Sequence, residues 1–367
     1  YPDLLEQAGY AIGCSGKGWD PGDWRPGGRK RNPAGPSFRS LGAFLQELPP
    51  GKPFCFWAGS RDPHRPYEAG SGIRAGIDPA RIIVPPIVPD TPEIRRDLAD
   101  YLFEVQRFDQ DLGVLLADLK GKGLLTNTLI AVTSDNGMPY PRGKCSLYDW
   151  GTREPLAIAW PGKIPPNRVI DDFVSLTDLA PTFLEAAGVP RPAEMPGRSL
   201  LPMLLSDCRG RVEKDRDRVF FGRERHDSYR REDGQPVGYP MRALRTGQFL
   251  YIRNFKPERF PCGDDPEKNQ DNDRGPAKTF VVTHKEDPAI KPFYDRAYGR
   301  RPAEELYDLA KDPDQLHNLA GDAAYTQTQT QLRAELDRRM TELNDPRRVE
   351  GKDPDVFDRY PIRQRPR

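Results

Sequence analysis

A short polar segment that directly follows an apolar run carries the residues best suited to chemistry. Leu129 to Val132 are apolar, and Asp135, Asn136 and Gly137 come soon after them. Open α/β sheets place their ligands at the carboxyl ends of strands, and a turn at Gly137 would let both polar side chains aim at one point. One carboxylate oxygen and one amide oxygen suit a hard cation such as Ca²⁺ or Mg²⁺.

Fixed positive charge follows this segment in the chain. Lys144 comes behind Arg142 and Gly143, a few residues beyond Asn136, and a metal beside fixed cations is one way to hold a tetrahedral oxyanion. The alternative is that Asp-Asn-Gly is only a surface turn, because these residue types are favoured there. The tripeptide taken alone favours the turn, so the decision depends on the longer pattern.

Two of the four histidines are candidates for a site. His64 follows the apolar run 53–59, which predicts a position at the end of a strand and makes it an acid/base candidate. A histidine that is hydrogen-bonded within a loop is about as good an interpretation. His226 follows Glu224 and Arg225, where a substrate contact and an ordinary surface histidine are equally plausible.

Periodicity predicts the elements that position these residues. The clearest helix covers 93–119, because its apolar residues recur at steps of three and four, with Thr91 as N-cap and Pro92 in the first turn. Other predicted helices cover 38–48, 177–187 (N-cap Thr177) and 326–344, and predicted strands cover 10–12, 53–59, 129–132, 155–160, 218–221, 241–245 and 249–253.

These elements predict an α/β fold with a mostly parallel sheet sandwiched by helices. A smaller C-terminal α+β domain follows, with an antiparallel sheet and one helix. We expect the large domain at 1–205, the small domain at 206–345 and a surface tail at 346–367.

Composition limits the class of protein. A net charge of +1 over 367 residues gives no strong field that would favour nucleic acid, and no apolar run is long enough for a membrane span. The 40 prolines indicate long, stiffened loops. The five cysteines show neither zinc spacing nor a dense disulfide framework. One bridge, between Cys208 and Cys262, stays open, but buried free thiols are favoured.

The longer pattern around Asp135 resembles the sulfatases of the alkaline-phosphatase-like superfamily, and most closely their sulfamidase (heparan N-sulfatase) branch. The matching motifs are Ser134-Asp135-Asn136-Gly137, Gly143-Lys144, Tyr148, Gly151-Thr152-Arg153-Glu154-Pro155, Gly16-Lys17, Asp62-Pro63-His64-Arg65, Tyr239-Pro240-Met241-Arg242 and Glu305-Leu306-Tyr307-Asp308-Leu309. They run in order through most of the chain, which makes the resemblance specific.

The resemblance implies a role for each of these residues. It implies that Asp135 and Asn136 are ligands of a metal ion, Ca²⁺ or alternatively Mg²⁺. It implies sulfate contacts at Lys17 and Lys144, and an acid or orienting role at the leaving group for His64. Substrate binding is implied for Arg153 and His226. The family nucleophile is a formylglycine made within C/S-x-P-x-R, a motif that this sequence lacks, and Trp19 stands where G-K-x-H would place a histidine.

Three hypotheses follow. The first is a sulfatase acting on sulfate esters or sulfamates of a sulfated carbohydrate, such as a glycosaminoglycan, with its nucleophile upstream of Tyr1. The second is a phosphoesterase of the same superfamily, and the third is a non-catalytic relative that binds sulfated glycans. The resemblance also implies a periplasmic, secreted or lysosome-like compartment and is compatible with a homo-oligomer. Neither nucleic acid nor a membrane span is expected.

Overall fold

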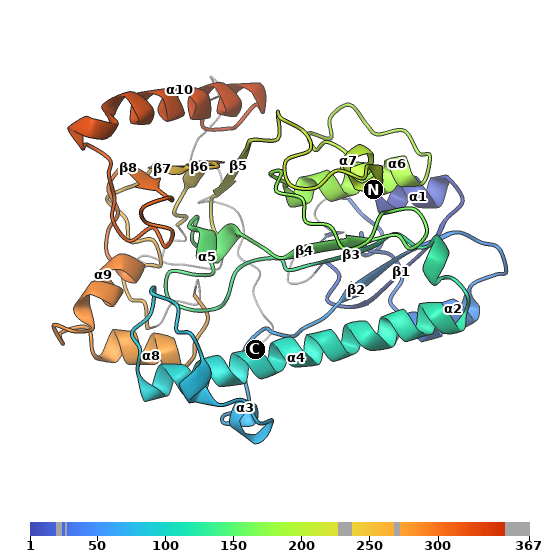
Figure 1. Ribbon diagram of the computed structural model, residues 1–367, viewed down its shortest axis with the longest axis horizontal. Coiled ribbons are helices and arrows are strands. Elements are labelled where there is room, and N and C mark those ends of the chain that lie inside the picture. Colours follow the sequence, from blue (N-terminus) through green and yellow to red (C-terminus); the bar gives the residue numbers. More distant parts are fainter. Residues whose placement is uncertain (20–23, 26–27, 227–236, 268–271, 349–367) are drawn as a thin grey trace. The chain divides into compact units, whose positions relative to one another are not determined.

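The computed structural model describes residues 1–19, 24–25, 28–226, 237–267 and 272–348, and its elements are labelled in Figure 1. The chain forms two compact units, each built from three separate segments. Unit 1 contains 1–64, 104–132 and 157–216, and unit 2 contains 65–103, 133–156 and 217–367. The α/β class and the C-terminal antiparallel sheet are confirmed.

Unit 1 begins with a parallel pair of strands. Helix α1 (Pro2–Gln7) leads into β1 (Ala11–Gly16), which pairs in parallel with β2 (Phe54–Gly59) along its whole length. The two strands end in register, Gly16 opposite Gly59. A Cβ at Gly59 would lie 1.7 Å from the carbonyl oxygen of Lys17, so only glycine permits this close approach of the two strand ends.

Two helices cover the strands of unit 1. Helix α2 (Leu41–Glu47) buries Leu41, Phe44 and Leu45 in a core that also contains Leu119 of α4. Helix α4 (Pro92–Gly121) has its residues divided between the two units. The predicted cap of α4 is confirmed, because the Ile94 amide donates to Thr91 Oγ1 at 3.4 Å.

The second half of unit 1 is a set of short elements. A 3₁₀ turn η3 (Leu125–Asn127) precedes β3 (Ile130–Thr133), which pairs with β4 (Leu156–Ala159). Helix α6 (Leu179–Ala186) follows η4 (Leu176–Asp178), and α7 (Leu201–Leu205) comes next. The predicted N-cap at Thr177 is wrong, because Ser175 and Asp178 form a reciprocal capping box two residues earlier.

Unit 2 is organised around a four-stranded antiparallel sheet in the order β5-β6-β7-β8. The strands are β5 (Arg218–Arg223), β6 (Met241–Thr246), β7 (Phe249–Asn254) and β8 (Glu304–Asp308). Successive residues alternate between the two faces. One face, with Leu244, Tyr251 and Leu306, packs against α10 (Thr326–Glu342), which lies along the sheet in Figure 1.

The opposite face of this sheet carries the loop that contains Lys144. Met241, Ala243, Leu250, Ile252 and Tyr307 on this face pack with Tyr239, Leu147 and Tyr148 in one buried cluster. Leu147 and Tyr148 immediately precede the short helix α5 (Asp149–Thr152). The sheet is therefore the platform on which that loop and α5 are held.

The expectation of one helix in the C-terminal part is wrong. Besides α10, the described part of the chain contains α8 (Pro276–Thr283) and α9 (Lys291–Tyr298), with the single turn η5 (Ala323–Tyr325) before α10. Each of α8 and α9 has only eight residues and a proline in its first turn. Two turns are too short for a clear apolar period. The sequence feature that could have indicated these helices was the proline at the start of each. The segment after residue 65 adds α3 (Ser71–Arg74) and η2 (Pro79–Arg81).

The remaining predictions concern thiols and membranes. All five cysteines are free thiols, so the open alternative of a bridge between Cys208 and Cys262 does not hold, and Cys208 is exposed rather than buried. Among the described helices, none combines the length and the apolar character that crossing a bilayer requires.

Candidate active site

The segment after β3 folds back on itself at Asp135 and Asn136. Thr133 Oγ1 donates to the carbonyl oxygen of Pro155 at 2.8 Å, and Ser134 Oγ donates to that of Asn136 at 2.9 Å. The Asn136 amide nitrogen donates to the Gly137 carbonyl at 2.9 Å. This uses the nitrogen end of the side chain. No hydrogen bond from the described residues reaches the amide oxygen, which is the end that would ligate a cation.

This turn is packed backbone to backbone against α5. The Gly137 amide donates to the Gly151 carbonyl at 3.2 Å. A Cβ at Gly137 would lie 2.0 Å from the Trp150 carbonyl oxygen, and one at Gly151 would lie 2.5 Å from the Gly143 carbonyl oxygen. Real side chains do not reach such distances, so the glycines of this segment are required by space rather than by turn geometry.

The loop between the turn and α5 is anchored through Tyr148. The Tyr148 hydroxyl donates to Glu305 Oε2 at 2.7 Å, and Glu305 also accepts from Tyr307 at 2.6 Å and from Asn254 at 2.7 Å. The Arg142 guanidinium lies 3.7 Å from the centre of the Tyr148 ring, where a cation is attracted to the aromatic face. Burial raises the pKa of the Tyr148 phenol, so it stays a neutral donor to Glu305.

A pocket of about 290 Å³, here named the SDNG pocket, lies beside this loop. It is lined by Asp135, Asn136, Lys144, Cys145, Ser146, Leu147, Gly151, Thr152, Gly222, Arg223, Arg225 and His226. The structure thus brings together four of the residues singled out from sequence: Asp135, Asn136, Lys144 and His226. The last comes from the end of β5, far along the chain.

Lys144 is held by a carboxylate that sequence reasoning missed. Its Nζ lies 2.8 Å from Asp273 Oδ2, and the side chains of Lys144 and Asp273 are 6% and 16% exposed. The neighbouring Asn272 is fully buried and donates to the Tyr140 carbonyl at 2.8 Å, while Lys278 Nζ donates to the Asn272 carbonyl at 2.6 Å. These contacts hold Asp273 beside Lys144, although the two residues are more than a hundred positions apart in the sequence.

Arg223 and Arg225 add positive charge to the SDNG pocket. Arg223 donates to the carbonyl oxygens of Cys145 and Pro261, which fixes its guanidinium at the rim of the loop. Both arginines precede His226 in the run Gly222-Arg223-Glu224-Arg225-His226. The signal that could have revealed them is this alternation of basic residues at the end of a strand, because alternate strand residues share a face.

Asp135 and Asn136 carry oxygen donors of the type that a hard cation takes, but the described residues contain no group of three or more His, Cys, Asp or Glu side chains that could hold a metal ion by itself. Burial, and after it repulsion by the Asp135 carboxylate, raise the pKa of Glu154 to about 7. Glu154 Oε1 is buried and accepts no hydrogen bond within the described residues. Two carboxyl groups that repel each other mark a place where a cation would be favourable. Asp135 and Asn136 supply only part of the six to eight oxygens that Ca²⁺ takes.

Comparison with known proteins decides the family. The family model named Sulfatase matches residues 23–189, and the model named N-sulphoglucosamine sulphohydrolase, C-terminal matches residues 143–256. The chain belongs to the sulfatase family. The second match spans the SDNG pocket from Lys144 to His226, so it supports a place close to the sulfamidase branch.

Individual relatives agree with this sulfatase assignment. Human N-sulphoglucosamine sulphohydrolase is 32% identical over 333 residues, which cover 80% of this chain and 62% of that protein. The chain therefore spans about three fifths of the length of this relative. The ulvan-active sulfatase of Formosa agariphila is 29% identical over 266 residues, covering 71% of this chain and 41% of that protein.

Solved structures show the same fold. A protein in complex with its substrate D-glucosamine-2-N,6-O-disulfate aligns with a TM-score of 0.59 at 20% identity, over 98% of this chain and 83% of the other. The phosphonate monoester hydrolase of Silicibacter pomeroyi aligns with a TM-score of 0.56 at 20% identity, over 93% and 68% of the two chains. At these identities the likeness concerns the fold alone.

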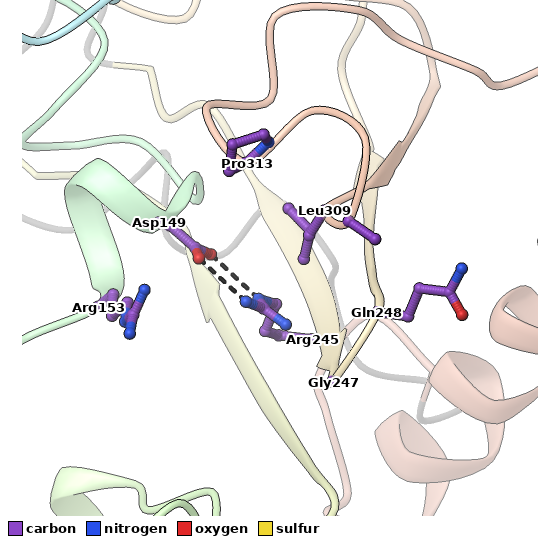
Figure 2. Close-up of a pocket in the computed structure, with 8 residues that line it drawn as sticks. Asp149, Arg153, Arg245, Gly247, Gln248, Leu309 and Pro313 are labelled. Atoms are coloured by element: carbon purple, nitrogen blue, oxygen red, sulfur yellow. Dashed lines mark hydrogen bonds and ion pairs between the residues drawn. The ribbon is translucent and has the colours of Figure 1, made fainter.

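Three of the residues predicted for the sulfatase site are not among the residues that line the SDNG pocket. Lys17 and His64 belong to unit 1, where they follow the carboxyl ends of the paired strands β1 and β2. Lys17 is half-buried and His64 is exposed. Arg153 directly follows α5 in unit 2 and lines a second pocket together with Asp149 and Arg245 (Figure 2).

Proposed function

We propose that the protein hydrolyses sulfate esters or sulfamates of a sulfated carbohydrate. The observation that carries the proposal is the lining of the SDNG pocket, where Asp135 and Asn136 lie with Lys144, Arg223 and Arg225. The lining carries three positive side chains and one negative, and Lys144 is also paired with Asp273, so an anionic sulfate group would meet several cations there. Such charges, held in place by the fold, stabilise a transferring anionic group without reorganising.

A divalent cation and a formylglycine complete the proposal. Asp135 and Asn136 would hold Ca²⁺ or Mg²⁺, which when bound neutralises charge on the sulfate group. The nucleophile is proposed to be a formylglycine, which would divide one difficult displacement into two steps.

The residues of this chain would bind and orient the sulfate. Lys144, whose Nζ is paired with Asp273, would contact a sulfate oxygen as a charged donor. Lys17 has the same proposed role, and His64 is proposed to protonate or orient the leaving group. His226 would contact the sugar from the end of β5, next to Arg225. All four roles are proposals that rest on the family motifs.

The proposed substrate is a sulfated sugar at the end of a glycan chain. The match of residues 143–256 to the C-terminal model of N-sulphoglucosamine sulphohydrolase supports a sulfated amino sugar. The proposed compartment is periplasmic, secreted or lysosome-like, in keeping with the sulfated glycans that such an enzyme would meet.

A substrate panel tests the proposal. The full-length protein would be assayed with Ca²⁺ for sulfate release from glucosamine N-sulfate, glucosamine 6-sulfate, a sulfated disaccharide and an aryl sulfate, and for phosphate release from an aryl phosphate. We expect turnover of at least one sulfated sugar that exceeds turnover of the aryl compounds. Preference for the phosphate ester would support the phosphoesterase alternative, and binding without turnover of any compound would support the non-catalytic one.

A further inference from the structure

A second pocket lies on the other side of α5 from the SDNG pocket. This cavity of about 580 Å³, here named the Arg153 pocket, is lined by Asp149, Arg153, Arg245, Gly247, Gln248, Leu309, Ala310 and Pro313. Gly151 and Thr152 of α5 line the SDNG pocket, whereas Asp149 of the same helix lines the Arg153 pocket. One short helix therefore forms a wall of both.

The charges of the Arg153 pocket leave one cation unmatched. Arg245 Nε and Nη2 lie 3.1 Å from the two oxygens of Asp149, and both side chains are 16% exposed. Figure 2 shows this pair joined directly, with Arg153 beside it on the α5 side and the Gln248 side chain directed away from Arg153. Arg153 is exposed, and no described residue forms an ion pair or hydrogen bond with its guanidinium. Two guanidinium groups and one carboxylate leave one positive charge.

The other groups that line the Arg153 pocket indicate the chemistry of the rest of a ligand that carries an anionic group. Gln248 is exposed; its Nε2 donates to Asp308 Oδ1 at 3.4 Å, which leaves its amide oxygen as an acceptor, and Asp149 keeps acceptor capacity beyond its two bonds with Arg245. Leu309, Ala310 and Pro313 supply apolar surface. Polar groups beside apolar surface, in a cavity of this size, are compatible with a small-molecule site. No described lining residue is aromatic, so the pocket lacks the platform on which a nucleobase would stack.

We propose that the Arg153 pocket is a second binding site, for a sugar unit that carries one sulfate or carboxylate group. The anion would pair with the planar guanidinium of Arg153, which favours bidentate acceptors. The ring hydroxyls would hydrogen-bond with Gln248 and Asp149, and the carbon-bound face of the ring would lie on Leu309 and Pro313. The choice of sugar rests on the proposed function, because a sulfated glycan would present such units next to the one that is cleaved.

Binding experiments on the full-length protein test this site, with the cation removed by a chelator so that no ligand is hydrolysed. The probes are N-acetylglucosamine 6-sulfate, glucuronic acid, neutral galactose and inorganic sulfate, measured by calorimetry. Hydrogen exchange would locate the contact. We expect each anionic sugar to protect the backbone amides around 247–248 and 309–313 from hydrogen exchange. Galactose and inorganic sulfate should bind at least tenfold more weakly.

Two variants and one control assign the binding to its residues. Arg153→Ala and Arg153→Gln should each weaken the binding of the anionic sugar at this pocket at least tenfold, because both remove the cation. Arg81→Ala, which removes an exposed arginine elsewhere in unit 2, should leave the binding of the anionic sugar unchanged. Arg153→Gln keeps a long polar side chain at this exposed position, so it keeps the test valid if Arg153→Ala proves unstable.

The outcomes separate this inference from the proposed function. A protein that releases sulfate from sugars but shows no protection at 247–248 and 309–313 overturns the second site alone. Protection there without any sulfate release overturns the proposed function alone. Equal binding of inorganic sulfate and the sulfated sugar would overturn the inference of a sugar site, because the pocket would then recognise the anion alone.

Discussion

The SDNG pocket and the Arg153 pocket share α5 but differ in how their charges are balanced. In the SDNG pocket Asp135 stands with Lys144, Arg223 and Arg225, and Lys144 is also paired with Asp273, so several charges of both signs lie together. In the Arg153 pocket Asp149 is already paired by Arg245 in a bidentate contact, and a single guanidinium is left. The first pocket suits a multiply charged centre and chemistry, whereas the second suits the recognition of one anionic group.

The largest effect expected is that of removing the acidic residue from the SDNG pocket. Asp135→Ala in the full-length protein should lower cation-dependent sulfate release by at least about 10³-fold, because a metal ligand and its charge are lost. The measurement is sulfate release with and without added Ca²⁺ or Mg²⁺. Binding of an anionic sugar at the Arg153 pocket should be unaffected.

The control for this variant is Asp111→Ala, which removes an exposed carboxylate from α4. Full activity of Asp135→Ala would remove Asp135 from the metal site. Loss of sugar binding at the Arg153 pocket in the same variant would show that the two pockets do not act separately.

A change beneath both pockets should affect them together. Glu305 is 2% exposed and accepts hydrogen bonds from Tyr148, Tyr307 and Asn254. Glu305→Ala would leave three buried donors without an acceptor, so we expect a loss of roughly 3–5 kcal/mol in the free energy of unfolding. Chemical denaturation measures it, with the exposed Glu286→Ala as control. A loss below about 1 kcal/mol would mean that the loop before α5 does not depend on this contact.

The partner of Lys144 should matter to the SDNG pocket alone. Asp273→Asn removes the charge that fixes the ammonium group, and a lysine that must be ordered on binding costs roughly 1.5–2 kcal/mol of side-chain entropy. We therefore expect kcat/KM for a sulfated sugar to fall about tenfold. The variant should cause no further loss in a Lys144→Ala background, since it acts through that residue.

The control for Asp273→Asn is Asp295→Asn, which removes an exposed carboxylate that pairs with Lys291 in α9. An additional loss in the Lys144→Ala background would show that Asp273 acts on the substrate directly.

The smallest effect expected is on the pH dependence of stability, at the sheet that supports both pockets. Hydrogen bonding with Arg333 lowers the pKa of Glu304 from 4.5 to about 2, helped by bonds from Tyr251 and Gln329. A lowered pKa gives stability that is present above about pH 4.5 and lost as the pH falls towards 2. Glu304→Gln should therefore be less stable than the parent at neutral pH, with the difference shrinking in acid.

Thermal unfolding across this pH range measures that difference. Glu258→Gln serves as control, because the Glu258 side chain is 66% exposed and has only a contact of 4.0 Å with Arg259. A difference that stays constant down to pH 2 would contradict the role given to the Glu304 carboxylate.

Local pattern was enough to predict one side of the SDNG pocket. Asp135, Asn136 and Lys144 lie in one continuous segment, so turn-forming residues and motif spacing placed them together without knowledge of the rest of the chain. The end of β5 at His226 was also found, through its resemblance to the family. The α/β class and the antiparallel sheet followed from runs of apolar residues with the right period.

The other side of the pocket could not be predicted in this way. Asp273 reaches Lys144 only because Asn272 is bonded to Tyr140 and Lys278, contacts between segments with no shared pattern. Arg153 stands next to Thr152 in the chain, yet a four-residue helix directs the two into different pockets. Motif spacing gives the order of residues along the chain. It does not give the direction in which each side chain of a short helix points.

The backbone packing of the Asp135 turn on α5 limits what mutation can do here. Gly137, Gly143 and Gly151 each have another residue's carbonyl oxygen within 2.5 Å of where a Cβ would be. In a saturation library selected only for expression and folding, these three positions should return glycine, although none of them has a positive φ that would by itself require it. The chain could then acquire new specificity from the side chains around the two pockets, while the backbone between them would resist variation even before catalysis is selected.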